Sequence, residues 1–168
     1  MGMYKNIKKT LINEYKDRSD VYKNKLSEWS KEPSVSKIKR PTNLPRARNL
    51  GYKAKEGIMI ARVRVRKGNR KRATVGGGRK PSKSGRYFSR SKSLQSIAEE
   101  RAAKKFTNFE ILNSYFAGEI GTHRFYEVIM LDKNGKVLLS DRKYSSILKN
   151  PHRAERGLTS SGRKHRGI

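Results

Sequence analysis

The sequence predicts an α+β fold, in which a small, mostly antiparallel sheet is flanked by helices and carries a long basic loop and extended termini. Apolar residues recur at helical spacing in the first thirty residues and again over 93–106. Residues 58–66 alternate with the period of two that is typical of a strand. Two further apolar runs, at 109–119 and 123–132, follow one another without an intervening helix, which favours a β-meander.

Composition limits the fold to one domain with a small core. The chain has 168 residues, 42 Lys and Arg against 14 Asp and Glu, a formal net charge of +28 and 33% hydrophobic residues. Such a chain can bury one small core but cannot build it from its whole length. We divide the single domain 1–168 into N-terminal helices at 1–32, a basic connector at 33–57, a core at 58–132 with a basic loop at 67–92, and a hairpin with a basic C-terminal extension at 133–168.

The first thirty residues predict two helices. Their apolar stripes consist of Tyr4, Ile7, Leu11, Ile12 and Tyr15 in the first, and of Tyr22, Leu26 and Trp29 in the second. Ser19 and Asp20 form an N-cap signal for the second helix. Core packing explains these aromatic residues better than base stacking does. From Pro33 to Pro45, three prolines predict an extended connector.

The alternating segment 58–66 predicts a strand with two different faces. One face carries Met59, Ala61, Val63 and Val65, and the other carries Ile58, Ile60, Arg62, Arg64 and Arg66. We expect the first face to cover the core and the arginine-bearing half of the strand to leave it, presenting a guanidinium about every 6.6 Å. The Gly-rich loop from Lys67 to about Lys92 holds almost no apolar side chains. We expect it to be disordered in the free protein and to order on a polyanion.

The second half of the chain predicts a helix capped by Ser93 and then a meander. The meander comprises strands at 109–119 and 123–132, a hairpin turn at Asn134-Gly135 and a returning strand at 137–140. The Gly- and Ser-rich end of the chain, 156–168, is expected to be extended.

The charge distribution predicts a polyanionic partner. No acidic residue stands between Glu56 and Glu99, so the basic residues of that segment cannot be neutralised within it. A net charge of +28 also opposes compaction by self-repulsion. Nucleic acid is the first candidate and an anionic membrane surface the second. No apolar run reaches the length of a transmembrane helix, the N-terminus lacks the apolar region of a secretory signal, and the absence of cysteine excludes disulfides and cysteine-based zinc sites.

RNA is favoured over DNA because the sequence shows no helix-turn-helix, zinc-finger or zipper pattern. Arginines can meet phosphate with a bidentate fork, and serines can donate to phosphate oxygens. Tyr87 and Phe88 either stack on unpaired bases or anchor the loop on the protein. The candidate RNA-contacting residues of the strand and loop are Arg62, Arg64, Arg66, Lys67, Arg70, Lys71, Arg72, Arg79, Lys80, Lys83, Arg86, Tyr87, Phe88 and Arg90.

The sequence offers no pattern for catalysis. His123, His152 and His165 are scattered without metal-ligand spacing, and Glu99 and Glu100 diverge by about 100° on their helix. An RNA-processing enzyme would require converging carboxylates for Mg²⁺. We therefore expect no enzymatic activity, no cofactor or metal and no small-molecule substrate.

Five ordered blocks give the chain a family resemblance. They are "RPTNLPRARNLGYKAKEG" at 40–57, "SLQSIAEERA" at 93–102, "LNSYFAGE" at 112–119, "YEVIMLD" at 126–132 and "RGLTSSGRKHRG" at 156–167. Over nearly its whole length the sequence resembles the archaeal and eukaryotic large-subunit ribosomal protein family L-fifteen-e (eL-fifteen). The resemblance implies a structural, non-enzymatic protein of the large ribosomal subunit in the cytoplasm, which folds with rRNA and lies beside neighbouring large-subunit proteins.

The resemblance adds basic residues outside the strand and loop to the predicted rRNA-binding set. They are Arg40, Arg46, Arg48, Tyr52, Lys53 and Lys55 in the first block, and Arg156, Arg163, Lys164 and Arg166 in the last. The chain departs from the family at Pro45, where an acid is usual, and at 133–150, where the family has a longer stretch; family members also usually continue beyond the last block with a basic tail. The alternative interpretation is a basic nucleic-acid chaperone or chromatin-like protein that acts on free DNA or RNA.

Overall fold

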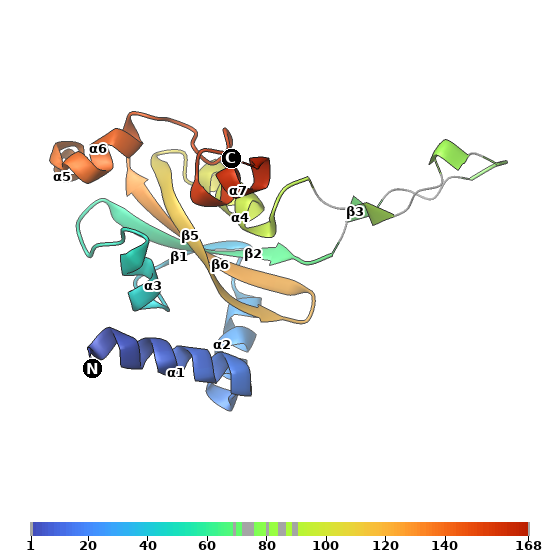
Figure 1. Cartoon of the computed structure of the whole chain (residues 1–168), viewed down its shortest axis with the longest axis horizontal. Coiled ribbons are helices and arrows are strands. Elements are labelled where there is room, and N and C mark those ends of the chain that lie inside the picture. The colour runs from blue at the N-terminus through green and yellow to red at the C-terminus, as the bar shows by residue number, and fades with distance from the viewer. Residues whose placement is uncertain are drawn as a thin grey trace.

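The computed structural model describes residues 2–68, 70–71, 76–79, 81–83, 87–88 and 91–167, with only the backbone at 70–71, 83 and 87–88. Figure 1 shows a sheet with helices against both faces. In chain order the elements are α1 (Met3–Asp17), α2 (Asp20–Lys31), β1 (Val35–Ile38), α3 (Leu44–Asn49), β2 (Ile58–Arg66), β3 (Arg70–Lys71), the 3₁₀ turn η1 (Pro81–Lys83), β4 (Tyr87–Phe88), α4 (Leu94–Lys105), β5 (Phe109–Ile120), β6 (His123–Asp132), α5 (Lys136–Ser140), α6 (Arg142–Leu148) and α7 (Ser160–Arg166).

The main sheet has four strands in the order β1-β2-β6-β5, and every neighbouring pair is antiparallel. The predicted fold class is therefore confirmed. The register between β2 and β6 places Val63 opposite Tyr126 on one face of the sheet and Arg62 opposite Glu127 on the other. The alternation along β2 accordingly sorts the strand's side chains between two separate cores.

Helix α4, with α7 packed beside it, covers one face of the sheet, and the other helices of the main body lie mainly against the opposite face (Figure 1). The α4 face buries Met59, Ala61, Val63, Val65, Ala98, Ala102, Ile111, Tyr126, Val128 and Met130. The opposite face buries Ala47, Leu112, Tyr115, Ile129, Leu131, Leu138 and Tyr144. The prediction that the apolar face of β2 covers a core is thus confirmed.

The N-terminal helices form as predicted. The Ser19 hydroxyl accepts a hydrogen bond from the Tyr22 backbone N–H and caps α2. On α2, Tyr22, Leu26 and Trp29 are buried against Phe125, which confirms that they are core residues. Helix α1 has no buried residue and lies at the edge of this helical layer.

The connector after Pro33 is more structured than predicted. Strand β1 pairs along the edge of β2, and a short helix, α3, begins after it. The Asn43 side chain accepts from the Arg46 N–H and caps this helix. Pro45 lies in the first helical turn, where its missing N–H costs nothing. The expected uniform extension at 33–45 is therefore wrong for α3, and Asn43 supplies a cap beside the unusual proline.

The returning strand predicted after Asn134-Gly135 is wrong. Strand β6 already lies between β2 and β5, so a strand following it finds no free edge beside β6. The chain instead forms α5 and α6, with Leu138 fully buried under the sheet and Asp141 capping α6. The predicted extension at 156–168 is also wrong, because α7 forms there behind a cap from Thr159.

Part of the basic loop forms a small antiparallel ribbon. Arg70 is opposite Phe88 and Lys71 is opposite Tyr87 in the β3–β4 pair. In Figure 1, β3 and η1 lie away from the body formed by the main sheet and its helices. Among the described residues, none of the helices combines the length and apolar character needed to cross a bilayer.

Candidate nucleic-acid interface

Arg62 is part of a buried polar network and does not leave the core. Its side chain is only 10% exposed, and its guanidinium nitrogens lie 2.8 Å from Glu32 and 3.4 Å from Glu127. The guanidinium also stacks over Trp29, with 4.0 Å between its central carbon and the ring centroid. The expected departure of the arginine-bearing half of β2 from the core is therefore wrong at Arg62. Two acids that are distant in sequence neutralise this cation: Glu32, directly after α2, and Glu127 in β6.

Glu127 is the centre of that network. It is fully buried and accepts hydrogen bonds from the Thr42 N–H and hydroxyl and from the Tyr115 hydroxyl. Burial, together with the negative charge of Glu127, raises the pKa of Tyr115, so its hydroxyl stays protonated as a donor. In every hydrogen bond described here, a carboxylate oxygen of Glu127 is the acceptor.

The other two arginines of β2 are progressively closer to solvent. Arg64 is half-buried and donates to the Ser30 carbonyl, and its own carbonyl accepts from Arg101 at 3.0 Å. Arg66 is exposed at the end of the strand. The structure therefore does not form the expected row of three equivalent guanidiniums, and Arg66 is the residue of the three that is fully available.

A cation cluster that the sequence reasoning missed lies beside Arg66. Glu119 is within 3.0 Å of Arg124, 3.3 Å of Lys67 and 3.5 Å of Arg18. The hydrogen bond from Arg124 is the main reason that the pKa of Glu119 lies below its usual range. Three cations share one carboxylate here, so the cluster keeps an excess of positive charge. Only Lys67 was among the predicted residues, because Arg18 and Arg124 are isolated in the sequence and approach Glu119 only in the folded sheet.

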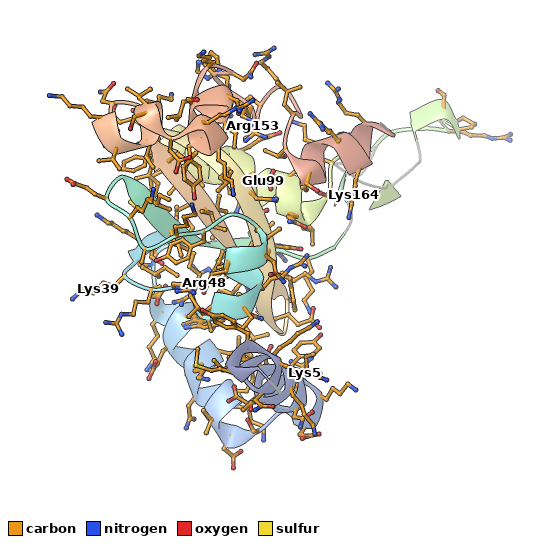
Figure 2. All side chains as sticks on the ribbon, turned by 60° about the vertical axis from the view of Figure 1, so that its left-hand side comes forward. Lys5, Lys39, Arg48, Glu99, Arg153 and Lys164 are labelled. Carbon is orange, nitrogen blue, oxygen red and sulfur yellow. The ribbon has the colours of Figure 1, made fainter. Side chains whose placement is uncertain are left out.

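The first basic block places its cations on and around α3. Arg40, Arg46 and Arg48 are exposed, and Arg48 lies over the Tyr4 ring with 5.2 Å between the guanidinium carbon and the ring centroid. Figure 2 labels Arg48 on α3 and Lys39, which precedes α3 in the connector.

The residues after α3 differ in how freely they face solvent. Lys53 is exposed with its ammonium 5.9 Å from the Tyr144 ring centroid, and Lys55 pairs with Asp141 at 3.2 Å. Tyr52 is half-buried and packs on the core cluster around Leu112. Tyr52 therefore has a packing role, whether or not it also touches a ligand.

Two buried carboxylates hold the end of the chain in place. Glu99 of α4, labelled in Figure 2, holds the last basic block, and Glu110 of β5 holds the residues just before that block. Glu99 accepts from the hydroxyls of Ser114 and Thr159, and burial raises its pKa above the ordinary value. Glu110 accepts from the backbone N–H groups of His152 and Arg153 at 2.9 and 3.0 Å.

This fastening leaves the basic residues at the end of the chain facing outwards. Arg156, Arg163, Lys164 and Arg166 are all exposed. Gly162 is buried so closely against Gly157 that an added Cβ would lie 2.6 Å from its backbone, so α7 depends on that glycine. Arg163, Lys164 and Arg166 are therefore presented from a packed helix, and Arg156 from the turn before it, and not from an extended tail.

The basic loop is only partly described. Arg79 is exposed, whereas Arg72, Lys80, Arg86 and Arg90 lie outside the described residues. For Arg70, Lys71, Lys83, Tyr87 and Phe88 the structure describes the backbone alone. Whether Tyr87 and Phe88 stack on bases or on the protein stays a prediction.

The described part of the chain thus uses most of its carboxylates internally and presents cations outwards. Glu32, Glu99, Glu110, Glu119 and Glu127 all hold partners within the protein. No group of three or more His, Asp or Glu side chains suited to a metal ion occurs among the residues described. The fold and charge distribution define a small basic α+β protein with its cations on the surface, the pattern expected of a nucleic-acid-binding protein.

Comparison with known proteins assigns the family. Residues 2–168 match the family described as "Ribosomal L15", in its L15e form. The chain is 48% identical over 167 residues to "Large ribosomal subunit protein eL15" of Methanocella arvoryzae, covering 98% of this chain and 82% of the relative. It is 47% identical over 155 residues to the protein of the same name from Metallosphaera sedula, covering 90% and 71%. The chain belongs to the eL15 family of ribosomal proteins, which confirms the resemblance that the five blocks indicated.

Proposed function

We propose that this chain binds and stabilises folded rRNA through contacts to phosphates, as a structural constituent of the large ribosomal subunit. Its family is structural and not enzymatic, and membership in that family supports a ribosomal, cytoplasmic location and association with rRNA and other ribosomal proteins. The observation that carries the phosphate-binding proposal is the division of charges. The internal carboxylates have partners within the protein, while cations from four separate parts of the chain remain exposed.

The exposed cations favour recognition of the backbone and shape of RNA over recognition of sequence. The proposed contacts comprise Arg40, Arg46, Arg48, Lys53, Arg66, Lys67, Arg79, Arg156, Arg163, Lys164 and Arg166, with the remaining basic residues of the loop. They come from the connector around α3, the end of β2, the loop and the C-terminal segment that includes α7, so no single groove-reading helix concentrates them. Such dispersed contacts fix orientation on RNA without reading base edges.

Salt dependence tests the phosphate contacts. Neutralising about ten phosphates would give a slope of roughly −7 to −9 in a plot of log affinity against log salt concentration. The measurement is the affinity of the full chain for a large-subunit rRNA fragment over a series of KCl concentrations. A slope near −2 would be incompatible with binding dominated by phosphate contacts.

Two arginines of β2 provide a matched test of the assignment. Arg66→Ala should weaken binding by about 1.5–3 kcal/mol, the value of a charged hydrogen bond, and leave the melting temperature unchanged. Arg62→Ala should instead lower the melting temperature, because it leaves Glu127 buried without its cation. Equal effects of both changes on RNA affinity, with neither changing thermal stability, would mean that the two roles are assigned wrongly.

The alternative is a basic chaperone that acts on free nucleic acid. It predicts similar affinity for any RNA of equal length, whereas an rRNA-binding protein should prefer its folded fragment. Co-sedimentation of the native protein with large subunits after a high-salt wash would separate the two functions.

A further inference from the structure

A groove beside α7 combines positive charge with an apolar wall. Its volume is about 480 Å³, and it lies between β5, α6 and the segment that leads into α7. The residues that line it and matter here are Leu112, Asn113, Ile147, Leu158, Arg163 and Lys164. Its volume lies in the range of small-ligand pockets, about 300–1,000 Å³.

Two of the cations that line the groove, both at its exposed side, are not balanced by an ion pair among the described residues. Arg163 and Lys164 are exposed, and neither has an ion-pair partner among the described residues. Arg153 lies at the base of the groove, where its guanidinium donates to the carbonyls of Ile111 and Leu112. Burial and then the nearby charge of Arg163 hold the pKa of Arg153 below its usual range, although Glu110 and Glu99 partly oppose this effect.

The nearest carboxylates cannot serve as counter-ions for the two exposed cations. Glu99 is buried on Ser114 and Thr159, and Glu110 is occupied by backbone N–H groups. An anion in the groove would therefore meet two positive charges that no carboxylate of the described residues neutralises. Phosphate is an anion that Arg and Lys side chains both bind well.

The remaining wall suits a flat, partly apolar group. Leu112 and Ile147 belong to or border the core, and together with Leu158 they line the groove with apolar side chains. Asn113 accepts from the Ser114 N–H through its Oδ1 at 2.9 Å, which orients the amide and leaves its Nδ2 as a donor for another group. A bare phosphate would use neither the apolar wall nor the amide. An unpaired base can use both, through packing against apolar side chains and hydrogen bonding at its edge.

We propose that this groove receives one unpaired nucleotide of the bound RNA, with its base against Leu112, Ile147 and Leu158 and its phosphates near Arg163 and Lys164. This inference rests on the RNA binding proposed above and adds a preference for a bulged or looped nucleotide at one place on the protein. Asn113 then acts as the edge-reading residue of the groove.

The test compares two RNA duplexes that differ by one unpaired adenosine, each binding the full chain at the same salt concentration. The wild type should prefer the bulged duplex by about tenfold, the scale of burying one stacked base. In the variant Arg163→Gln/Lys164→Gln this preference should fall to near one. The control Lys5→Gln/Lys8→Gln removes the same charge from exposed positions on α1, far from α7 (Figure 2), and should weaken both duplexes equally while keeping their ratio.

A second measurement locates the base and does not depend on charge. With 2-aminopurine as the unpaired nucleotide, binding of the wild type should change its emission, and Asn113→Ala should reduce that change more than Lys5→Gln does. Equal affinity for the two duplexes would overturn the groove proposal and leave the proposed RNA binding intact. Failure to bind either duplex or the rRNA fragment would instead contradict the proposed function. Displacement of the bulged RNA by an acidic peptide, with no change in 2-aminopurine emission, would assign the groove to a protein partner and refute the nucleotide proposal.

Discussion

Removal of the Glu127 carboxylate should destabilise the fold strongly, although the residue is remote from the exposed cations. In Glu127→Ala the Thr42 N–H and hydroxyl and the Tyr115 hydroxyl lose their acceptor in a buried site. Arg62 loses one of two carboxylates but keeps Glu32 at 2.8 Å. Removing one member of a buried pair costs about 3–5 kcal/mol. The retained Glu32 places this change in the lower part of that range, about 3–4 kcal/mol.

This loss is a large share of the 5–15 kcal/mol that holds a typical domain. At roughly 2–4 °C per kcal/mol for a chain of this size, the melting temperature should fall by about 6–16 °C. Thermal melts of the free protein, followed by circular dichroism, measure it. Glu56→Ala is the matched control, since it makes the same charge change at an exposed residue and should alter stability by less than about 0.5 kcal/mol. If Glu127→Ala and Glu56→Ala have the same melting temperature, the buried network does not stabilise the sheet and the reasoning fails.

Two further changes test the packing of α2 and the burial of a second carboxylate. Gly118→Ala would place a Cβ 2.9 Å from the Tyr22 hydroxyl and 3.0 Å from Leu26, so this overpacking should lower the free energy of unfolding in urea by about 1–3 kcal/mol. The control Gly76→Ala places its Cβ within 4 Å of no other atom and should be neutral. Equal stability of the two variants would mean that α2 does not pack on β5 at Gly118. Burial raises the folded-state pKa of Glu99 above 4.5, so the folded protein binds its proton more tightly than the unfolded chain, and ionisation should cost stability as pH rises from about 4.5 through the folded pKa. Relative to Glu99→Gln, the wild type should therefore lose free energy of unfolding over that pH window, and a constant difference between the two curves would contradict a raised pKa.

The sequence by itself determined the elements that carry their own local signals. The hydroxyls of Ser19 and Ser93 cap α2 and α4 as predicted, because a cap depends only on the residues of the first helical turn. The alternation over 58–66 fixed which side chains of β2 share a face, because successive residues of any strand point to opposite sides. The excess of cations and the five ordered blocks likewise identified the family, since both are properties of the chain before it folds.

Only the tertiary structure decided which charges remain available to a partner. Arg62 and Arg66 look equivalent in the sequence. In the structure Arg62 is buried and bonded to Glu32 and Glu127, which lie 30 and 65 positions away from it in the chain, whereas Arg66 is exposed. The position of β6 between two strands decided against a returning strand, because hydrogen-bonding edges are set by strand order and not by a local turn signal. The groove beside α7 has the same origin. Its apolar wall and its cations come from segments that approach one another only when Glu99 and Glu110 fasten the end of the chain to the sheet.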